Sequence, residues 1–379
     1  MPTPASSPRP SRGTTSVAPA NHPTRVAILG LGQMGLVCAG ILSEPPLSVP
    51  TARGSAAAKP PPATPRANVR LWGHSPDEAG ALMQTRASPR LPGFTLAPHV
   101  RIAVKDSDAL EGADLIVSAV PVQFSRQVWE RLRRHVPPTC PIVSVAKGIE
   151  NTTLLRPTQI IAQALGGDAG EPARALACLS GPTIAAELAK CLPATMVAAS
   201  DDAALAKRIQ GLFTTRWLRI YTHHDLVGVE IAGAIKNVIA IAAGVLDGLH
   251  AGNNAKSALL ARGLAEIARL GAAMGASPDT FFGVTGVGDL ATSCFSPEGR
   301  NRSLGEALGR GQTLEQALRA SRHVVEGVAT TRSVADLARK HKVEMPITAA
   351  VYAILFDGLD PIEAIGTLMT RSPKAERVG

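Results

Sequence analysis

Short apolar runs alternate with helix-compatible segments along the first 221 residues of the chain. The clearest runs lie in residues 26–29, 69–76, 113–121 and 141–148, and segments 175–190 and 194–200 continue the alternation. Strands that are buried on both faces have such nearly continuous apolar sequences, and strands that alternate with helices form parallel sheets. The pattern therefore predicts an α/β fold whose N-terminal part is a doubly wound parallel sheet.

Beyond about Tyr221 the strand pattern disappears, and the remaining sequence is rich in Ala and Leu at helical spacing. The helical segments cover residues 230–243, 256–274, 302–309, 313–322, 329–341 and 347–356. Periodicity of this kind is typical of helices that pack on one another. We predict an all-α C-terminal domain over residues 222–379, which follows an N-terminal domain over residues 24–221.

Two stretches have compositions that disfavour regular structure. Residues 1–23 combine Pro, Ser, Thr and Ala with no acidic residue, and they lack the apolar core of a secretory signal. Residues 43–68 are rich in Pro, Ala and Ser. We predict a disordered tail at 1–23 and a low-complexity insertion at 43–68 within the N-terminal domain.

The segment from Val227 to Leu249 is long and apolar enough to cross a bilayer, which requires about 20 residues. It contains Glu230, Lys236 and Asp247, however, and a Lys or Asp at mid-span costs about 2.5–3.5 kcal/mol. No aromatic belt flanks the segment. We therefore predict that it is a core helix and that the chain has no membrane span.

On a helical wheel of this segment, Lys236 lies off the stripe of Ile and Val residues that predicts core packing. Its neighbours on the same face are all small: Ala232, Gly233, Ala240 and Ala243. Small neighbours serve either close helix packing or a cleft in which a ligand reaches the amine, and periodicity alone does not decide between these two interpretations.

The composition narrows the class of ligand. The chain has 39 Lys and Arg against 30 Asp and Glu, a formal net charge of +9, but only 3% aromatic residues. Single-stranded nucleic acid is bound on aromatic platforms, so we expect no nucleic-acid partner, and the charge favours either a basic surface or a small anionic ligand. The five Cys form no C-x-x-C pair, which predicts no metal site and a reducing compartment, the cytoplasm.

The sequence Gly30-x-Gly32-x-x-Gly35 stands between the first predicted strand and a helix. There the first glycine permits a tight turn, the second lets the backbone approach a pyrophosphate, and the third allows the helix to pack on the strand. We therefore predict a Rossmann-like, dinucleotide-binding N-terminal domain. The second strand ends at Gly73 and His74 rather than at an acid, which somewhat favours NADPH over NADH and places His74 beside the adenosine ribose.

Further polar residues stand in apolar or glycine-rich contexts: Lys147, Thr183, Asp289, Arg300 and Asn301. Read singly, Asp289 could cap the helix that follows it, and Arg300 could be a solvated surface residue. Together with Lys236 this set suits a small phosphorylated keto substrate. An arginine and a helix N-terminus bind phosphate, and a lysine close to other charges can titrate low enough to exchange a proton.

Several longer motifs resemble those of the NAD(P)-dependent glycerol-3-phosphate dehydrogenases of the bacterial type, over residues 24–371. In this chain they read "AKG", "SGPTIAAEL", "GVEIAGAIKNVIAIAAG", "GLAE", "GVGDLATSC", "GRNR" and "VVEG". The resemblance implies an enzyme that interconverts dihydroxyacetone phosphate and sn-glycerol 3-phosphate by hydride transfer with NAD(P)H, and so supplies glycerol 3-phosphate for phospholipid synthesis. It also implies a homodimer.

The resemblance further implies roles for single residues. Lys236 is implied to accept the proton when glycerol 3-phosphate is oxidised and to donate it in the reverse direction. The implied substrate site comprises Lys147, Gly181, Thr183, Lys236, Asp289, Gly299, Arg300 and Asn301. The implied cofactor site comprises Gly30, Gly32, Gln33, Met34, Gly35, His74, Lys147, Ala185, Arg300, Val324 and Glu326.

Some features depart from the family's usual sequence. The loop "GLGQMG" is spelled as in β-hydroxyacid dehydrogenases, "VPVQFSRQV" replaces a more usual "VPSH" type, and Gly299 stands where a serine is frequent. The loop keeps a β-hydroxyacid dehydrogenase as the alternative enzyme. The altered loop and the insertion keep a non-catalytic dinucleotide-binding protein as an alternative of another class, although a decayed enzyme has no reason to retain the polar set.

Overall fold

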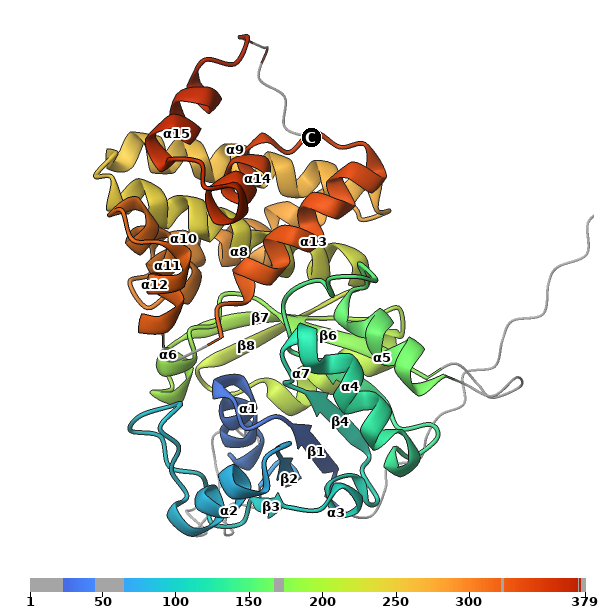
Figure 1. The fold of residues 1–379 in the computed structure, drawn as a ribbon. Helices are drawn as coiled ribbons and strands as arrows, with labels where there is room; N and C mark the ends of the chain where they lie inside the picture. The colour runs from blue at the N-terminus through green and yellow to red at the C-terminus, as the bar shows by residue number, and fades with distance from the viewer. Residues whose placement is uncertain (1–22, 45–64, 167–173, 322–323, 374, 376–379) are drawn as a thin grey trace, which may run out of the picture.

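A single eight-stranded sheet, in the order β3-β2-β1-β4-β5-β6-β7-β8, forms the centre of the N-terminal part (Figure 1). The structure is a computed structural model that describes residues 23–44, 65–166, 174–321, 324–373 and 375. The predicted tail up to residue 22 and residues 45–64 of the predicted insertion lie outside the described residues. The strands are β1 (Arg25–Leu29), β2 (Asn68–Trp72), β3 (Arg101–Ala103), β4 (Leu115–Ser118), β5 (Ile142–Ser144), β6 (Leu176–Ser180), β7 (Ala194–Ala199) and β8 (Leu218–His223).

The strand order reverses at β1, which pairs in parallel with β2 on one side and β4 on the other. In open α/β sheets the crevice beyond the carboxyl ends of the strands at such a reversal is where ligands bind. The connecting helices are α1 (Gln33–Ser43), α2 (Pro76–Thr85), α3 (Asp106–Leu110), α4 (Val122–Leu132), α5 (Pro157–Leu165), α6 (Ala185–Ala189) and α7 (Ala203–Phe213), with a short 3-10 turn, η1 (Arg133–His135). The predicted α/β class is confirmed.

One pair of strands differs from the uniformly parallel sheet that the sequence predicts. Strands β6 and β7 are antiparallel, with Cys178 opposite Ala199, whereas all the other neighbouring pairs of the described sheet are parallel. A parallel crossover needs an element long enough to carry the chain back along the sheet. Helix α6 has only 5 residues, so β7 starts at the edge where β6 ends.

The elements after β8 are helical and gather on one side of the sheet (Figure 1). They are α8 (Leu226–Gly248), α9 (Gly252–Ala273), η2 (Pro278–Phe282), η3 (Val284–Gly288), α10 (Asp289–Phe295), α11 (Arg300–Gly309), α12 (Leu314–Ala320), α13 (Glu326–His341), α14 (Pro346–Tyr352), η4 (Ala353–Asp357) and α15 (Pro361–Met369). Each predicted helical segment overlaps one of these helices. Helix α10 corresponds to the helix that Asp289 could cap, whereas α15 has no predicted counterpart.

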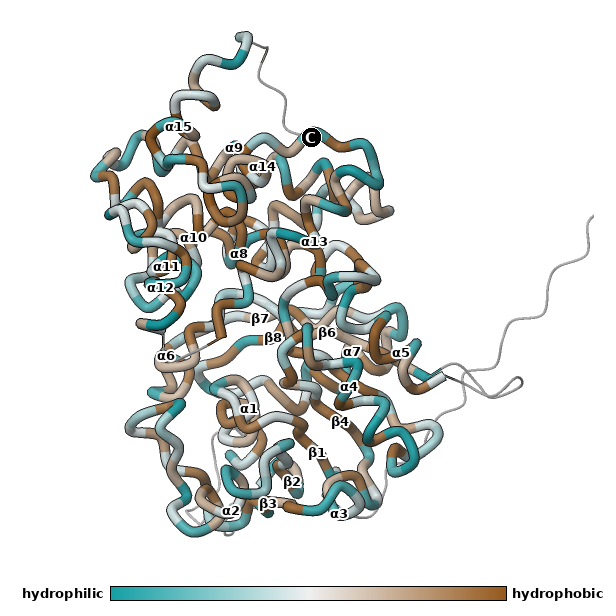
Figure 2. Tube along the Cα trace, viewed as in Figure 1, coloured by the Kyte–Doolittle hydropathy of each residue, from teal (hydrophilic) through white to brown (hydrophobic). Residues whose placement is uncertain are grey.

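Helix α8 is the core of the helical part and contacts α9, α10, α11 and α13. It is long and apolar enough to cross a membrane, but 89% of its most apolar window is buried inside the protein. Its predicted stripe is fully buried, with Ile231, Ile235 and Ile239 each 0% exposed. The strands of the sheet are likewise apolar where they are buried, as β1 and β4 show (Figure 2). These contacts support a core helix.

Helices α8 and α11 approach each other backbone to backbone. A Cβ on Gly244 would overlap the carbonyl oxygen of Arg302, and a Cβ on Gly305 would overlap that of Ile241. Side chains elsewhere on a helix keep axes about 8–10 Å apart, so two glycines at the crossing allow a closer approach. The crossing fixes the start of α11 beside the middle of α8, where Lys236 lies.

Candidate active site

The glycine loop joins β1 to α1 and lies against the end of β2. The N–H of Gly30 donates to the carbonyl oxygen of Trp72 at 2.7 Å. Gly30 has φ of 122°, a left-handed conformation that favours glycine, and a Cβ on Gly35 would overlap the Gly30 carbonyl oxygen. By contrast, a Cβ on Gly32 would meet no atom within 4 Å, and the first turn of α1 has no side-chain cap. The loop is packed below and open toward the cleft above it.

This open space belongs to a cleft of about 360 Å³ between the sheet and the helical part. Most of the predicted site residues line it: Gly32, Gln33, Met34, Lys147, Thr183, Ala185, Lys236, Asp289, Gly299, Arg300, Asn301, Val324 and Glu326. Gly30 and Gly35 instead shape the loop beneath, and the carbonyl oxygen of Gly181 accepts a hydrogen bond from Lys147. His74 is exposed and is not among the described lining residues, so its contact with the ribose stays a prediction.

Two lysines from different parts of the chain share one carboxylate in this cleft. Lys236 Nζ, from the middle of α8, donates to Asp289 Oδ1 at 2.5 Å. Lys147 Nζ, from the segment after β5, donates to Asp289 Oδ2 at 2.5 Å. Asp289 begins α10 and is 1% exposed, so it is fully removed from water. The cluster carries two positive charges against one negative charge, which suits an anionic ligand.

Lys147 is held by the loop that follows β6 as well as by Asp289. Its Nζ donates to the carbonyl oxygen of Gly181 at 2.8 Å and to Thr183 Oγ1 at 3.3 Å. Burial lowers the pKa of Lys147 to about 8; the charge of Asp289 opposes this shift, and that of Lys236 adds to it. A Cβ on Gly233 would lie 3.5 Å from Lys147 Cγ, so the small face of α8 makes room for the stem of this second lysine.

Ser293 is a contact of Lys236 that the sequence analysis missed. Its Oγ accepts a hydrogen bond from Lys236 Nζ at 2.6 Å, and it stands one helical turn after Asp289 on α10. A signal was available in the sequence, because a hydroxyl four residues after an acid lies on the same face of a helix. The sequence indicates the helix after Asp289 only as one that Asp289 could cap, so the spacing to Ser293 was not used.

Hydrogen bonds between amide groups link α8, which carries Lys236, to the start of α11, where phosphate binding is expected. Asn301 Nδ2 donates to Asn237 Oδ1 at 2.9 Å, and Asn301 Oδ1 accepts from the N–H of Gly327 at 3.0 Å. Asn301 thus links α8, α11 and the start of α13, in addition to lining the cleft. Asn237, which neighbours Lys236, is a second residue that was not predicted for the site.

Arg300 and Glu326 form the rim of the cleft where α11 and α13 begin. Arg300 Nη1 donates to the carbonyl oxygen of Val324 at 3.0 Å, and its side chain is exposed. Burial raises the pKa of Glu326, and the charges of Arg300, Lys147 and Lys236 oppose that rise. Helix α11 starts without a side-chain cap, after Gly299, so its first N–H groups are available to an anion at the cleft.

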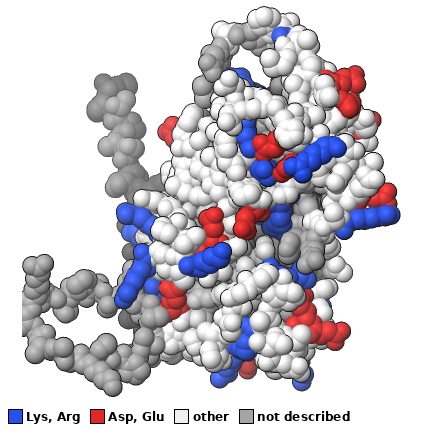
Figure 3. Space-filling view, turned by 90° about the vertical axis from the view of Figure 1, so that its left-hand side faces the viewer, with Lys and Arg blue, Asp and Glu red and all other residues white. Residues whose placement is uncertain are grey.

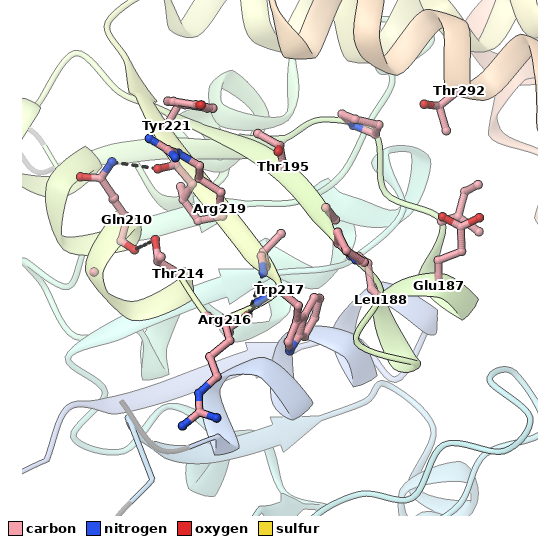
Figure 4. Close-up of a pocket in the computed structure, with 18 residues that line it drawn as sticks. Glu187, Leu188, Thr195, Gln210, Thr214, Arg216, Trp217, Arg219, Tyr221 and Thr292 are labelled. Atoms are coloured by element: carbon pink, nitrogen blue, oxygen red, sulfur yellow. Dashed lines mark hydrogen bonds between the residues drawn. The ribbon is translucent and has the colours of Figure 1, made fainter. Parts of the chain in front are cut away.

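A second hollow, of about 1040 Å³, lies over β7 and β8 (Figure 4). The guanidinium of Arg219 covers the ring of Tyr221 there, 5.0 Å from its centroid, whereas Arg216 extends away from both (Figure 4). None of the predicted site residues is among the described residues that line it. The cluster of lysines and acid therefore singles out the smaller cleft as the site of chemistry.

The surface has no continuous basic band on the face that Figure 3 shows. Lys and Arg side chains are interspersed there with Asp and Glu (Figure 3). Within the described residues, no three His, Cys, Asp or Glu side chains are grouped closely enough to hold a metal ion. The face that Figure 3 shows therefore offers no extended basic surface to a polyanion.

The fit to a dinucleotide rests on the open space at Gly32 and the uncapped start of α1, which together suit a pyrophosphate. Because the lysine pair lines the same cleft, the fold and the site define a dinucleotide-dependent oxidoreductase of the doubly wound α/β class. Models of the NAD-dependent glycerol-3-phosphate dehydrogenase N-terminus and C-terminus match residues 25–206 and 225–366. The chain belongs to the NAD-dependent glycerol-3-phosphate dehydrogenase family.

Individual relatives agree with this placement. A glycerol-3-phosphate dehydrogenase [NAD(P)+] of Thermobifida fusca is 40% identical over 357 residues, which cover 94% of this chain and 99% of the relative. One from Salinibacter ruber is 46% identical over 310 residues, with 82% and 90% covered. The crystal structure of glycerol-3-phosphate dehydrogenase from Coxiella burnetii has a TM-score of 0.82 and 31% identity, and covers 92% of this chain and 99% of its own. The predicted resemblance is confirmed, and the family is not that of the β-hydroxyacid alternative.

Proposed function

We propose that this chain interconverts dihydroxyacetone phosphate and sn-glycerol 3-phosphate with NAD(P)H or NAD(P)+, and that it contributes glycerol 3-phosphate to phospholipid synthesis. The observation that carries the proposal is the pair of lysines on Asp289, in a cleft that the glycine loop also lines. Family membership supplies the identity of the substrate. The chain is thus an oxidoreductase rather than a non-catalytic binding protein.

In this proposal Lys236 exchanges the proton on the substrate oxygen. Its ammonium is oriented by two acceptors on α10, Asp289 Oδ1 and Ser293 Oγ, which leave the third N–H for the substrate. NAD(P)H supplies the hydride when it is bound. Lys147 keeps a second positive charge beside the oxygen that becomes negative, which favours the charged form of the transition state. Asp289 holds both amines at fixed positions.

The substrate phosphate is assigned to the start of α11. Arg300 offers a planar guanidinium at the rim, and the uncapped N–H groups that follow Gly299 point along the dipole of a 10-residue helix. Asn301 is fixed there by its bonds to Asn237 and Gly327. The absence of a serine side chain at Gly299 leaves phosphate binding to these groups.

The direct test is the initial rate of nucleotide oxidation by the purified protein with dihydroxyacetone phosphate, measured separately with NADH and NADPH. We expect turnover with both nucleotides. Activity on a 3-hydroxy acid with none on dihydroxyacetone phosphate would overturn the proposal. Binding of NADPH with no oxidation on any keto phosphate would revive the non-catalytic alternative.

Further assignments belong to this proposal. The family resemblance supports a homodimer, which light scattering tests, and the absence of a C-x-x-C pair supports a cytoplasmic location, which fractionation tests. Residues 24–221 form the dinucleotide-binding domain and residues 222–379 the helical substrate domain, and both contribute residues to the cleft. The loop beside His74 has no acid at the end of β2, which supports use of NADPH as well as NADH.

A further inference from the structure

An exposed ion pair stands at the adenosine end of the cleft, on residues to which no role has been assigned. Arg90 lies in the loop between α2 and β3 and lines the cleft together with Gly32 and Gln33. Its Nε donates to Glu78 Oε1 at 2.6 Å, and its Nη2 donates to Glu78 Oε2 at 3.3 Å. Its Nη1 has no hydrogen-bond partner among the described residues. Both side chains are accessible, at 45% for Arg90 and 32% for Glu78.

The position of this pair is fixed from two directions. Gln33 Nε2, at the start of α1, donates to the carbonyl oxygen of Arg90 at 2.8 Å, which ties the loop to the phosphate-binding turn. Glu78 lies in the first turn of α2, where its N–H donates to the capping Ser75 Oγ at 3.3 Å. Helix α2 follows directly after β2. The pair therefore stands beside the end of β2 and the glycine loop at once.

That corner is where a doubly wound domain meets the adenosine ribose. An acid at the end of β2 binds the 2′-hydroxyl of NAD, and an arginine nearby accommodates the 2′-phosphate of NADP. In this chain β2 ends at Trp72 and is followed by Gly73, which packs on Leu31 of the glycine loop. The nearby acid and the nearby arginine, Glu78 and Arg90, are both present and are bound to each other.

We propose that Arg90 is the residue that recognises the 2′-phosphate of NADP(H), and that Glu78 limits this preference. The guanidinium offers Nη1 to a phosphate, and a phosphate is bound more strongly by a planar arginine fork than by a neutral donor. The Glu78 carboxylate partly neutralises Arg90 and repels a second anion, so the same pair keeps the site open to NAD(H). The inference deepens the proposed function by naming what sets its cofactor choice.

The test compares binding of 2′,5′-ADP and 5′-AMP to the ligand-free protein by titration calorimetry, because the two differ only in the 2′-phosphate. For Arg90→Met we expect the affinity for 2′,5′-ADP to fall about tenfold or more, with 5′-AMP unchanged within about twofold. Arg90→Lys keeps a point charge and should lose less. For Glu78→Gln we expect the affinity for 2′,5′-ADP to rise about threefold.

Arg319 and Glu315 provide the matched control. They form another exposed Arg–Glu ion pair, on α12, with exposures of 78% and 74%, and neither is among the described residues that line the cleft. Arg319→Met and Glu315→Gln should leave both affinities unchanged. Equal loss of both nucleotides in Arg90→Met, or an unchanged ratio in Arg90→Met and Glu78→Gln, would overturn the assignment. Neither nucleotide contains the nicotinamide ring that transfers the hydride, so this result does not depend on whether the protein reduces dihydroxyacetone phosphate.

Discussion

Lys236 Nζ lies 2.5 Å from Asp289 Oδ1, and the two residues come from helices α8 and α10, 53 positions apart in the chain. Because Asp289 binds Lys147 through its other oxygen, one buried carboxylate sets the positions of both amines. Fixed charges of this kind need no rearrangement when charge develops on the substrate. Substitutions of the individual members of this cluster should therefore change turnover in different ways.

Replacing Lys236 by Met should reduce kcat by about 10²–10⁴-fold, because the proton donor of the reaction is removed. Binding of NADPH, measured by fluorescence titration, should change little. Lys256→Met is the control, since Lys256 is also buried and bonded to an aspartate, Asp247, at 2.7 Å. Retention of turnover within tenfold in Lys236→Met would rule out this role.

Replacing Asp289 by Asn should abolish most turnover and also lower the free energy of unfolding by about 3 kcal/mol, because two buried amines lose their counter-charge. Asp247→Asn separates the two effects. Asp247 likewise holds two cations, Lys256 at 2.7 Å and Arg302 at 2.8 Å. We expect both variants to unfold at lower urea concentration, but only Asp289→Asn to lose kcat. Equal kcat in the two would contradict the assignment.

The pH dependence of dihydroxyacetone phosphate reduction should show a descending limb near pH 8. The pKa of Lys147 is lowered to about 8, so this amine is charged below that pH and neutral above it. The positive charge beside the developing oxyanion is therefore lost as pH rises. Profiles of kcat/KM from pH 6 to 10 test this, and Lys147→Arg should move the limb upward. A flat wild-type profile across pH 8 would speak against a charged Lys147 in the reaction.

Replacing Ser293 by Ala removes one of the two acceptors that orient Lys236. We expect kcat to fall about tenfold while KM for the substrate stays nearly constant, because the hydroxyl contacts the lysine rather than the phosphate. Ser293→Thr keeps the hydroxyl and should restore most of the activity. If Ser293→Thr is as impaired as Ser293→Ala, the hydroxyl does not position the amine.

Two glycine substitutions should separate folding from cofactor binding. In Gly35→Ala a methyl group would overlap the Gly30 carbonyl oxygen, so we expect a loss of about 1–3 kcal/mol in the free energy of unfolding. In Gly32→Ala the methyl group enters open space in the cleft. That variant should melt like the wild type but bind NADPH about tenfold more weakly. Scanning calorimetry measures the unfolding of both variants, and titration calorimetry measures their binding of NADPH. Unchanged NADPH affinity in Gly32→Ala would contradict binding of the dinucleotide in this cleft.

The sequence alone identifies those site residues that are charged or polar within an apolar or glycine-rich stretch. Lys236 in an apolar helix and Asp289 in a glycine-rich turn stand out for that reason, and the structure brings them together. Ser293 and Asn237 do not conflict with their neighbours, and their contacts come from the packing of α8 on α10 and α11. Such contacts depend on tertiary packing, which local patterns do not contain.

The strands also divide into those that the sequence predicts and those that it does not. Strands with several consecutive apolar residues are predictable, whereas β3, with 3 residues, carries too short a pattern to stand out. Strand β8 alternates buried Leu218 and Ile220 with exposed Arg219 and Tyr221, so its sequence lacks the continuous apolar run of a buried strand. The antiparallel direction of β7 depends on the length of α6, a property of the connection rather than of the strand.

The crossing of α8 and α11 restricts how this enzyme can diversify. Where the backbones meet, at Gly244 and Gly305, no side chain fits without separating the two helices. That separation would draw Lys236 away from the residues at the start of α11. A change of substrate or cofactor is therefore accommodated more easily in a peripheral loop, such as the one that carries Arg90, than at this junction.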